Sequence, residues 1–172
     1  MMDFMNAELS FEDHVRYFSS HLCRTYGLSL ENPSRSGGTV ALANEEVRLR
    51  FNPGDVRDAF IHVYVQYEDP AVLGLPHKSF ELRRYIDYCD ARDLFPNRYP
   101  PEDLEFPSAT HLGLNKDYCY IGSPFLIQEM MNFLMVHGDP ILRVERKKIA
   151  AFIEWVDEKD REYNRRASRP RE

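Results

Sequence analysis

The chain has 172 residues, 43% of them hydrophobic and 13% aromatic, with a formal net charge of −6 and a pI near 5.5. This length fits one domain with a sizeable core, and the acidity argues against general nucleic-acid binding, which needs clustered Lys and Arg. No run of about 20 apolar residues is present, so we expect no membrane-spanning helix.

The cysteines and the first residues indicate the cellular compartment. Cys23, Cys89 and Cys119 are sparse, odd in number and form no CxxC pair, so they do not make a disulfide framework. The opening segment MMDFMNAELS lacks the basic stretch and the apolar run of a secretory signal. We therefore expect a cytoplasmic protein whose thiols are free.

The first predicted element is a helix that follows Ser10. Ser10 and Asp13 have the spacing of an approximate capping box. Gly27 suits the left-handed position after the last turn of a helix. The apolar stripe of this helix consists of Phe11, Val15, Phe18 and Leu22.

Alternating apolar and polar residues then predict a run of antiparallel strands. Strands are expected over residues 39–43, 46–51 and 60–68, with turns at Asn44 and over 52–55. The polar residues of the last two strands should share the face opposite the core. They are Arg48, Arg50, His62, Tyr64 and Gln66.

Two interpretations of this polar face stay open. A mixed basic and aromatic patch can bind a carboxylate, a phosphate or RNA bases. Alternatively the face is solvated and neutralised by Glu46 and Glu68, or is partly covered by a helix. The residue pattern alone does not choose between a working surface and a plain one.

The middle of the chain contains a predicted helix over 79–95, with Leu82, Tyr85, Ile86 and Cys89 on one face. Cys89 on that stripe is a buried small residue rather than a nucleophile. Prolines between residues 96 and 107 exclude regular helix there. Residues 110–122 are expected to form a second hairpin.

Helices complete the domain. Residues 123–138 are apolar around nearly the whole circumference, which predicts a central buried helix. A last helix begins at Asp139-Pro140, with a charged outer face. Its apolar face consists of Leu142, Ile149, Phe152, Ile153 and Val156. The order of elements predicts an α+β domain over 1–163: an antiparallel sheet of about five strands, packed by N-terminal, middle and two C-terminal helices.

The final residues 164–172 are polar and basic. The segment NRRASRPRE holds four arginines and one glutamate, which is a net charge of +3. It contains a proline and has no apolar periodicity, so we expect a disordered tail.

No motif predicts catalysis or a cofactor. None of the six histidines forms HxH, HxxxH or HExxH, and no cysteine pair has zinc spacing. Gly37-Gly38 lies in no phosphate-binding motif, and GxSxG is absent. We therefore expect neither a metal nor a cofactor, and a protein that is not an enzyme.

An acidic segment from Asp87 to Glu105 is the main candidate for partner binding. It holds six carboxylates against two arginines, a net charge of −4, together with aromatic rings and several prolines. Acidic groups attract a basic partner, and rings anchor it. The predicted contact residues are Asp90, Asp93, Tyr99, Glu102, Asp103 and Glu105. The alternative is a surface connection without a role.

The whole pattern resembles a known class of proteins. The segments FEDHVRYFSSHLCRTYGLSL, VRLRFNPGDVRDAFIHVYVQYED, ELRRYIDYC and IAAFIEWVD follow one another as a leading helix, an antiparallel sheet and flanking helices. This order is similar to that of small, acidic, cytoplasmic immunity proteins that accompany bacterial polymorphic toxins. The resemblance implies a non-enzymatic inhibitor that binds a cognate toxin, expected to be a basic domain, and blocks its active site.

Two other functions remain as alternatives. The chain is a small enzyme if Arg50 and His62 line a polar cleft on the sheet. It is a regulatory or chaperone-like adaptor if the methionine-rich helix is exposed, which requires Met130, Met131 and Met135 to face solvent.

Overall fold

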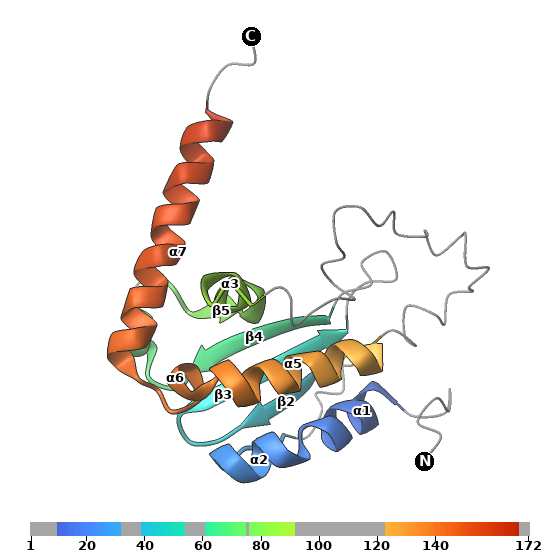
Figure 1. The fold of residues 1–172 in the computed structure, drawn as a ribbon. Coiled ribbons are helices and arrows are strands. Elements are labelled where there is room, and N and C mark those ends of the chain that lie inside the picture. Colours follow the sequence, from blue (N-terminus) through green and yellow to red (C-terminus); the bar gives the residue numbers. More distant parts are fainter. Residues whose placement is uncertain (1–9, 32–38, 54–60, 75, 92–122, 169–172) are drawn as a thin grey trace, which may run out of the picture.

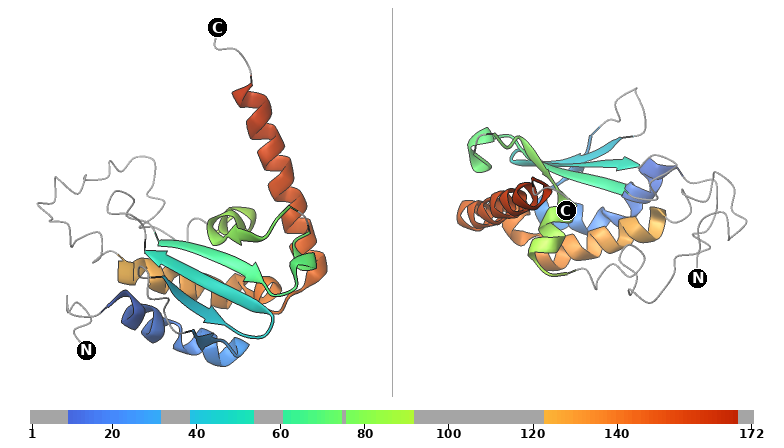
Figure 2. Two further views of the ribbon diagram at one scale, coloured as in Figure 1. Left: turned by 180° about the vertical axis from the view of Figure 1, so that it is seen from behind. Right: turned by 90° about the horizontal axis from the view of Figure 1, so that it is seen from above.

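Helices cover one face of an antiparallel sheet in the computed structural model of this chain, and no α-helix of the described part lies over the other face (Figure 1, Figure 2). The structure describes residues 10–31, 39–53, 61–74, 76–91 and 123–168. The strands lie in chain order, each antiparallel to the next: β1 (Ser29–Leu30), β2 (Val40–Ala43), β3 (Val47–Pro53), β4 (Ile61–Tyr67) and β5 (Ser79–Glu81). The expected α+β class with about five antiparallel strands is confirmed.

A layer of helices supplies the other half of the core. The helices are α1 (Phe11–Phe18), α2 (Ser20–Tyr26), α3 (Leu82–Tyr88), α5 (Ser123–His137), α6 (Asp139–Leu142) and α7 (Arg146–Ala167), with the 3-10 turn η1 (Pro70–Val72). α1 packs on α5, α5 contacts β4, and α3 lies between β4 and α7. None of the helices in the described ranges combines the length and the apolar character that a membrane crossing needs.

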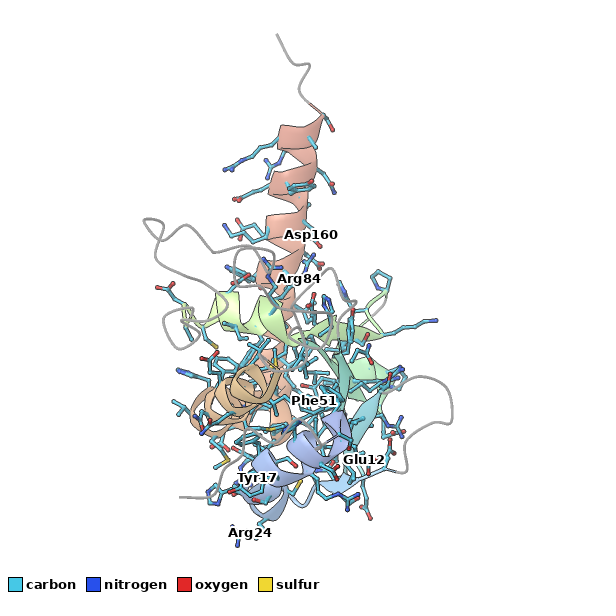
Figure 3. All side chains as sticks on the ribbon, turned by 90° about the vertical axis from the view of Figure 1, so that its right-hand side faces the viewer. Glu12, Tyr17, Arg24, Phe51, Arg84 and Asp160 are labelled. Atoms are coloured by element: carbon cyan, nitrogen blue, oxygen red, sulfur yellow. The ribbon has the colours of Figure 1, made fainter. Side chains whose placement is uncertain are left out.

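The period-two pattern of the strands decides which of their residues enter the core. Val47, Leu49 and Phe51 of β3 are fully buried, and β4 repeats the alternation. Leu49 lies opposite Leu42 of β2 on one side and Val65 of β4 on the other. Phe51 lies inside the body against the helical layer (Figure 3). The strand prediction for this region is confirmed.

The N-terminal helix is interrupted at Ser19, where one continuous helix was expected. The capping box is present, because Asp13 N–H donates to Ser10 Oγ at 3.1 Å and Ser10 N–H donates to Asp13 Oδ2 at 3.0 Å. Ser19 is buried, and its hydroxyl donates to the Arg16 carbonyl at 3.4 Å. Such back-bonding by serine bends helices. Gly27 has φ 65° and ends α2 in the left-handed conformation, as predicted.

The predicted helix over 79–95 is shorter than expected, and its first residues are a strand. Ser79–Glu81 form β5, because Phe80 lies opposite Val65 and turns into the core. The helix begins at Leu82 and ends at Tyr88. The fifth strand of the sheet therefore comes from a segment that we expected to be helical. Residues 92–122, including the expected second hairpin, lie outside the described residues.

The C-terminal helix also differs from the prediction. A turn at Arg143–Glu145 separates α6 from α7, and Val144 in this turn has φ 52°. The tail expected from residue 164 is still helical as far as Ala167. α7 runs out beyond the sheet and the other helices (Figure 1). Arg84 and Asp160 mark the level at which it leaves the body (Figure 3), and their Nη1 and Oδ1 atoms are 2.8 Å apart.

Candidate binding face

The polar side chains of the central strands lie together on the sheet surface opposite the helices. We call this surface the outer face. Arg50 lies opposite Tyr64, and Arg48 lies opposite Gln66, across the β3–β4 pair. Arg50 is exposed, whereas the other members are half-buried. The prediction that Arg48, Arg50, His62, Tyr64 and Gln66 share one face is therefore confirmed.

Arg48 is already occupied by acidic neighbours. Its Nε and Nη2 atoms donate to Glu31 Oε2 and Oε1, both at 2.9 Å, and Nη2 lies 3.4 Å from Glu68 Oε1. The hydrogen bond to Glu31 and the two negative charges raise the pKa of Arg48, against a smaller opposing effect of desolvation. The interpretation that Glu46 and Glu68 neutralise the face holds in part: Glu68 pairs with Arg48, whereas no ion pair joins Glu46 to Arg48. Arg48 therefore serves as a cross-link between sheet segments.

Arg50 has no such partner. It is exposed, and it makes no hydrogen bond or ion pair with any residue in the ranges that the structure describes. On β2, the residue opposite Arg50 is Ala41, which is small and uncharged. The guanidinium of Arg50 thus keeps its donors for a group that comes from outside the described part of the chain.

His62 is held in place on the same face. Its Nδ1 atom is 2.9 Å from Glu81 Oε1, and its ring stacks with Tyr64 at a centroid distance of 6.4 Å. The contact with the carboxylate fixes the orientation of the ring. Tyr64 and Glu81 lie opposite each other across the β4–β5 pair. The ring positions are therefore fixed before any ligand arrives.

Two acids of this face, Glu31 and Glu81, were not predicted as members. Glu31 follows the two-residue strand β1, and it reaches Arg48 only because β1 pairs with β2. Glu81 was assigned to a helix, whereas it lies in β5 next to β4. The alternation Ser79-Phe80-Glu81, polar–apolar–polar, is the one sequence signal that could have placed Glu81 on the sheet.

Only the beginning of the acidic segment, residues 87–91, belongs to the described part of the chain. Of the predicted contact residues, the structure describes Asp90, which is exposed and has φ 51°. Asp90 occupies the left-handed position after α3, where the Ala91 N–H donates to the Ile86 carbonyl at 3.1 Å. The others, Asp93, Tyr99, Glu102, Asp103 and Glu105, lie outside the described residues, and their role stays a prediction.

The methionine-rich helix does not offer the binding surface that the adaptor alternative requires. Met130 is 1% and Met131 is 3% exposed, and Met135 is partly buried against the core. These side chains fill the space between the helices and the sheet, as expected of flexible thioethers. The prediction of a buried helix is confirmed for the side of α5 that carries Met130 and Met131, whereas Val136, which was expected to be buried too, is 70% exposed.

Metal ligands and reactive thiols do not gather in the described ranges. Within them no group of three or more His, Cys, Asp or Glu side chains could hold a metal ion. Cys23 and Cys89 are half-buried and free, and burial raises the pKa of the Cys89 thiol. A raised pKa disfavours the thiolate, so Cys89 is a poor nucleophile. Cys119 lies outside the described residues.

Comparison with known proteins gives no match. No protein-family model, no curated protein and no solved structure matches this chain. The function is therefore inferred from the chemistry of the outer face and from the charge of the chain.

Proposed function

We propose that this chain is a protein-binding inhibitor of the immunity type, which neutralises a cognate toxin by covering its active site. The observation that supports the proposal best is the outer face. It is a sheet surface over which no described α-helix lies, and it presents Arg50, which pairs with no described residue, among polar neighbours. A binding protein needs a surface of this kind, because its partner must find groups whose hydrogen-bonding capacity is not yet used.

The outer face is also pre-arranged. The strands beneath it are tied down by fully buried residues such as Leu49 and Val65. The Arg48–Glu31 and His62–Glu81 contacts fix side chains that would otherwise lose rotamer freedom on binding. Side chains that are ordered in advance lower the entropic cost of association, and this supports a binding role.

The size of the outer face suggests that the contact extends beyond it. If all five strands had the seven residues of β3 and β4, they would span about 19 Å by 23 Å, so the flat area of the face is below roughly 450 Å². A standard interface buries about 800 Å² on each partner. We therefore expect a second segment of the chain to contribute, and the acidic segment that begins at Asp87 is the candidate with the right charge for a basic toxin.

Overall charge supports the same kind of partner. With a net charge of −6, the chain attracts basic proteins over long range and repels nucleic acid. A toxin domain that acts on nucleic acid carries a basic active-site surface, which an acidic inhibitor can cover.

The proposal is tested by capture followed by a growth assay. The tagged full chain is used as bait in an extract of the native host, and captured proteins are identified by mass spectrometry. The captured protein, or the product of a neighbouring gene, is then expressed alone and together with this chain. Growth arrest that co-expression relieves is the expected result. Normal growth with the captured protein alone, or arrest that co-expression does not relieve, would overturn the proposal.

A second candidate function rests on the His62–Glu81 pair. A histidine oriented by a carboxylate is the usual form of a general base. Arg50 lies on the neighbouring strand, diagonally opposite His62, and such diagonal neighbours are about 7–8 Å apart. In this reading the outer face is the floor of an enzyme site. His62→Ala separates the two functions: an enzyme loses its turnover altogether, whereas an inhibitor binds the toxin more weakly but keeps the rest of its contact surface and still relieves part of the growth arrest.

A further inference from the structure

The position of Arg50 among its neighbours indicates what kind of group it binds. One row of residues crosses the outer face from β2 to β5. Its members are Ala41, Arg50, Tyr64 and Glu81, each opposite the next. Arg50 thus lies in the middle of the sheet, with a small side chain on one side and a phenol ring on the other.

The acids that could neutralise Arg50 are bound to other residues. The carboxylate of Glu31, beyond Ala41, accepts two hydrogen bonds from Arg48. Glu81, at the far end of the row, contacts Nδ1 of His62. Arg48 and Arg50 lie two positions apart on one strand, yet only Arg48 has acidic partners in the described part of the chain. Arg48 therefore has a structural role, whereas the guanidinium of Arg50 is not bound by any described residue.

We propose that Arg50 is a receptor for a carboxylate side chain of the partner protein, which it binds through its planar guanidinium beside Tyr64. The inference deepens the proposed function and rests on it for the identity of the partner. A carboxylate accepts two parallel N–H donors from one guanidinium, which gives the contact both strength and orientation. Ala41 leaves room for the incoming group, and the half-buried Tyr64 ring shields it from solvent on the other side.

The charge around Arg50 favours a carboxylate over a phosphate. Among the described residues, Arg48 and Arg50 share the outer face with the carboxylates of Glu31, Glu68 and Glu81, so the acids there outnumber the arginines. A phosphate group or a nucleic-acid backbone carries more negative charge and is repelled by these glutamates. A single carboxylate meets the least repulsion and still uses the bidentate geometry of the arginine.

The experiment follows individual arginine side chains by NMR. The full-length protein is titrated with a capped, glycine-rich peptide that contains one glutamate, and the Nε–Hε signals are recorded. A peptide with glutamine in place of the glutamate serves as the control ligand. Arg83 serves as the control residue, because it is exposed on α3 and also has no hydrogen bond or ion pair in the described ranges.

A saturable shift of the Arg50 signal with the glutamate peptide, a linear and smaller shift of Arg83, and no saturation with the glutamine peptide are the expected results. Equal, linear shifts of Arg50 and Arg83 would overturn the inference, because they would mean non-specific screening. A saturable shift with inorganic phosphate that exceeds the shift with the glutamate peptide would also overturn it.

Variants test the same site in the complex. Arg50→Gln should shorten the lifetime of the complex with the captured toxin, and Arg50→Lys should restore part of that lifetime. Arg48→Lys should instead lower the free energy of unfolding, because Arg48 holds Glu31 and Glu68. An unchanged lifetime in Arg50→Gln refutes the anchoring role. The peptide titration needs no toxin, so the two ideas can fail separately: a saturable Arg50 shift without relief of growth arrest refutes the proposed function alone.

Discussion

Tyr67 and Ile141 are joined by a buried hydrogen bond, in which the Tyr67 hydroxyl donates to the Ile141 carbonyl at 3.0 Å. The bond links β4 to α6 through two residues that lie 74 positions apart in the chain. Burial raises the pKa of Tyr67 far above its usual value, so the phenol remains a neutral donor. The contact closes the sheet onto the end of the helical layer.

Tyr67→Phe should therefore destabilise the fold. The substitution keeps the ring and leaves the buried Ile141 carbonyl without its donor, which costs about 1–3 kcal/mol. The measurement is the free energy of unfolding in urea. Tyr64→Phe is the matched control, because the Tyr64 ring lies on the half-buried outer face. Equal losses in the two variants would show that the Tyr67 bond has no special weight.

Gly138→Ala should destabilise the protein more than Gly27→Ala. A Cβ at Gly138 would collide with the carbonyl of Leu134, which belongs to helix backbone and cannot move aside. Overpacking of this kind costs about 1–3 kcal/mol or more. At Gly27 a Cβ meets nothing within 4 Å, and only the left-handed φ of 65° is strained, at about 1 kcal/mol. Thermal unfolding of both variants checks the order, and a reversed order would mean that the α5–α6 junction can adjust.

Asp90→Gly should be at least as stable as the wild type, and Asp90→Ala should be less stable. Asp90 has φ 51° at the end of α3, a conformation that glycine adopts freely and alanine does not. The free energies of unfolding of the two variants should differ by about 1 kcal/mol, with glycine the more stable. Within a helix the order is the opposite, because alanine is there the more stable residue. Chemical denaturation measures both. A more stable alanine variant would show that the α3 terminus is not held in this conformation.

Residues that act locally were predicted well from the sequence. The period-two alternation of Val47, Leu49 and Phe51 needs only a buried face to become a strand, and the fold supplies one. Ser10 and Gly27 act within one helical turn of their own positions, so the helix ends that they mark were predicted correctly. Such signals do not depend on distant parts of the chain.

The remaining differences have tertiary causes. Phe80 fits a helix and a strand equally well by spacing, and its pairing with Val65 decides in favour of the strand. The break between α6 and α7 depends on Val144 at a positive φ, which its residue type disfavours and only the surrounding fold imposes. On the outer face, one of the two open interpretations named Glu68 as a neutralising acid, and it could do so because the strand that ends there was predicted correctly. Glu31 was missed because its place depends on strand pairing.

His14 should make the protein less stable as the pH falls. Burial lowers its pKa from 6.5, against a smaller opposing effect of Asp13. The unfolded chain therefore binds the proton more readily than the folded one, so stability is full above about pH 6.5 and declines as the pH falls from there toward the lowered folded-state pKa. His14→Gln should flatten this slope. Unfolding free energies of both proteins between pH 8 and pH 5, about 1.5 units either side of the ordinary histidine pKa, test the sign. An unchanged slope would contradict it.

Asp103→Lys combined with Glu105→Lys should slow association with the toxin, because these residues belong to the predicted acidic contact segment. The two reversals change the net charge by +4, and electrostatic steering predicts a loss of about tenfold or more in the association rate at low salt. The matched control is Glu154→Lys with Glu158→Lys, which makes the same charge change at exposed positions on α7. Stopped-flow mixing with the captured toxin measures both rates, with circular dichroism as the check on folding. If the two double variants slow association equally, only the total charge acts and the acidic segment is not the contact. If neither slows it, steering by acidic residues plays no part in recognition.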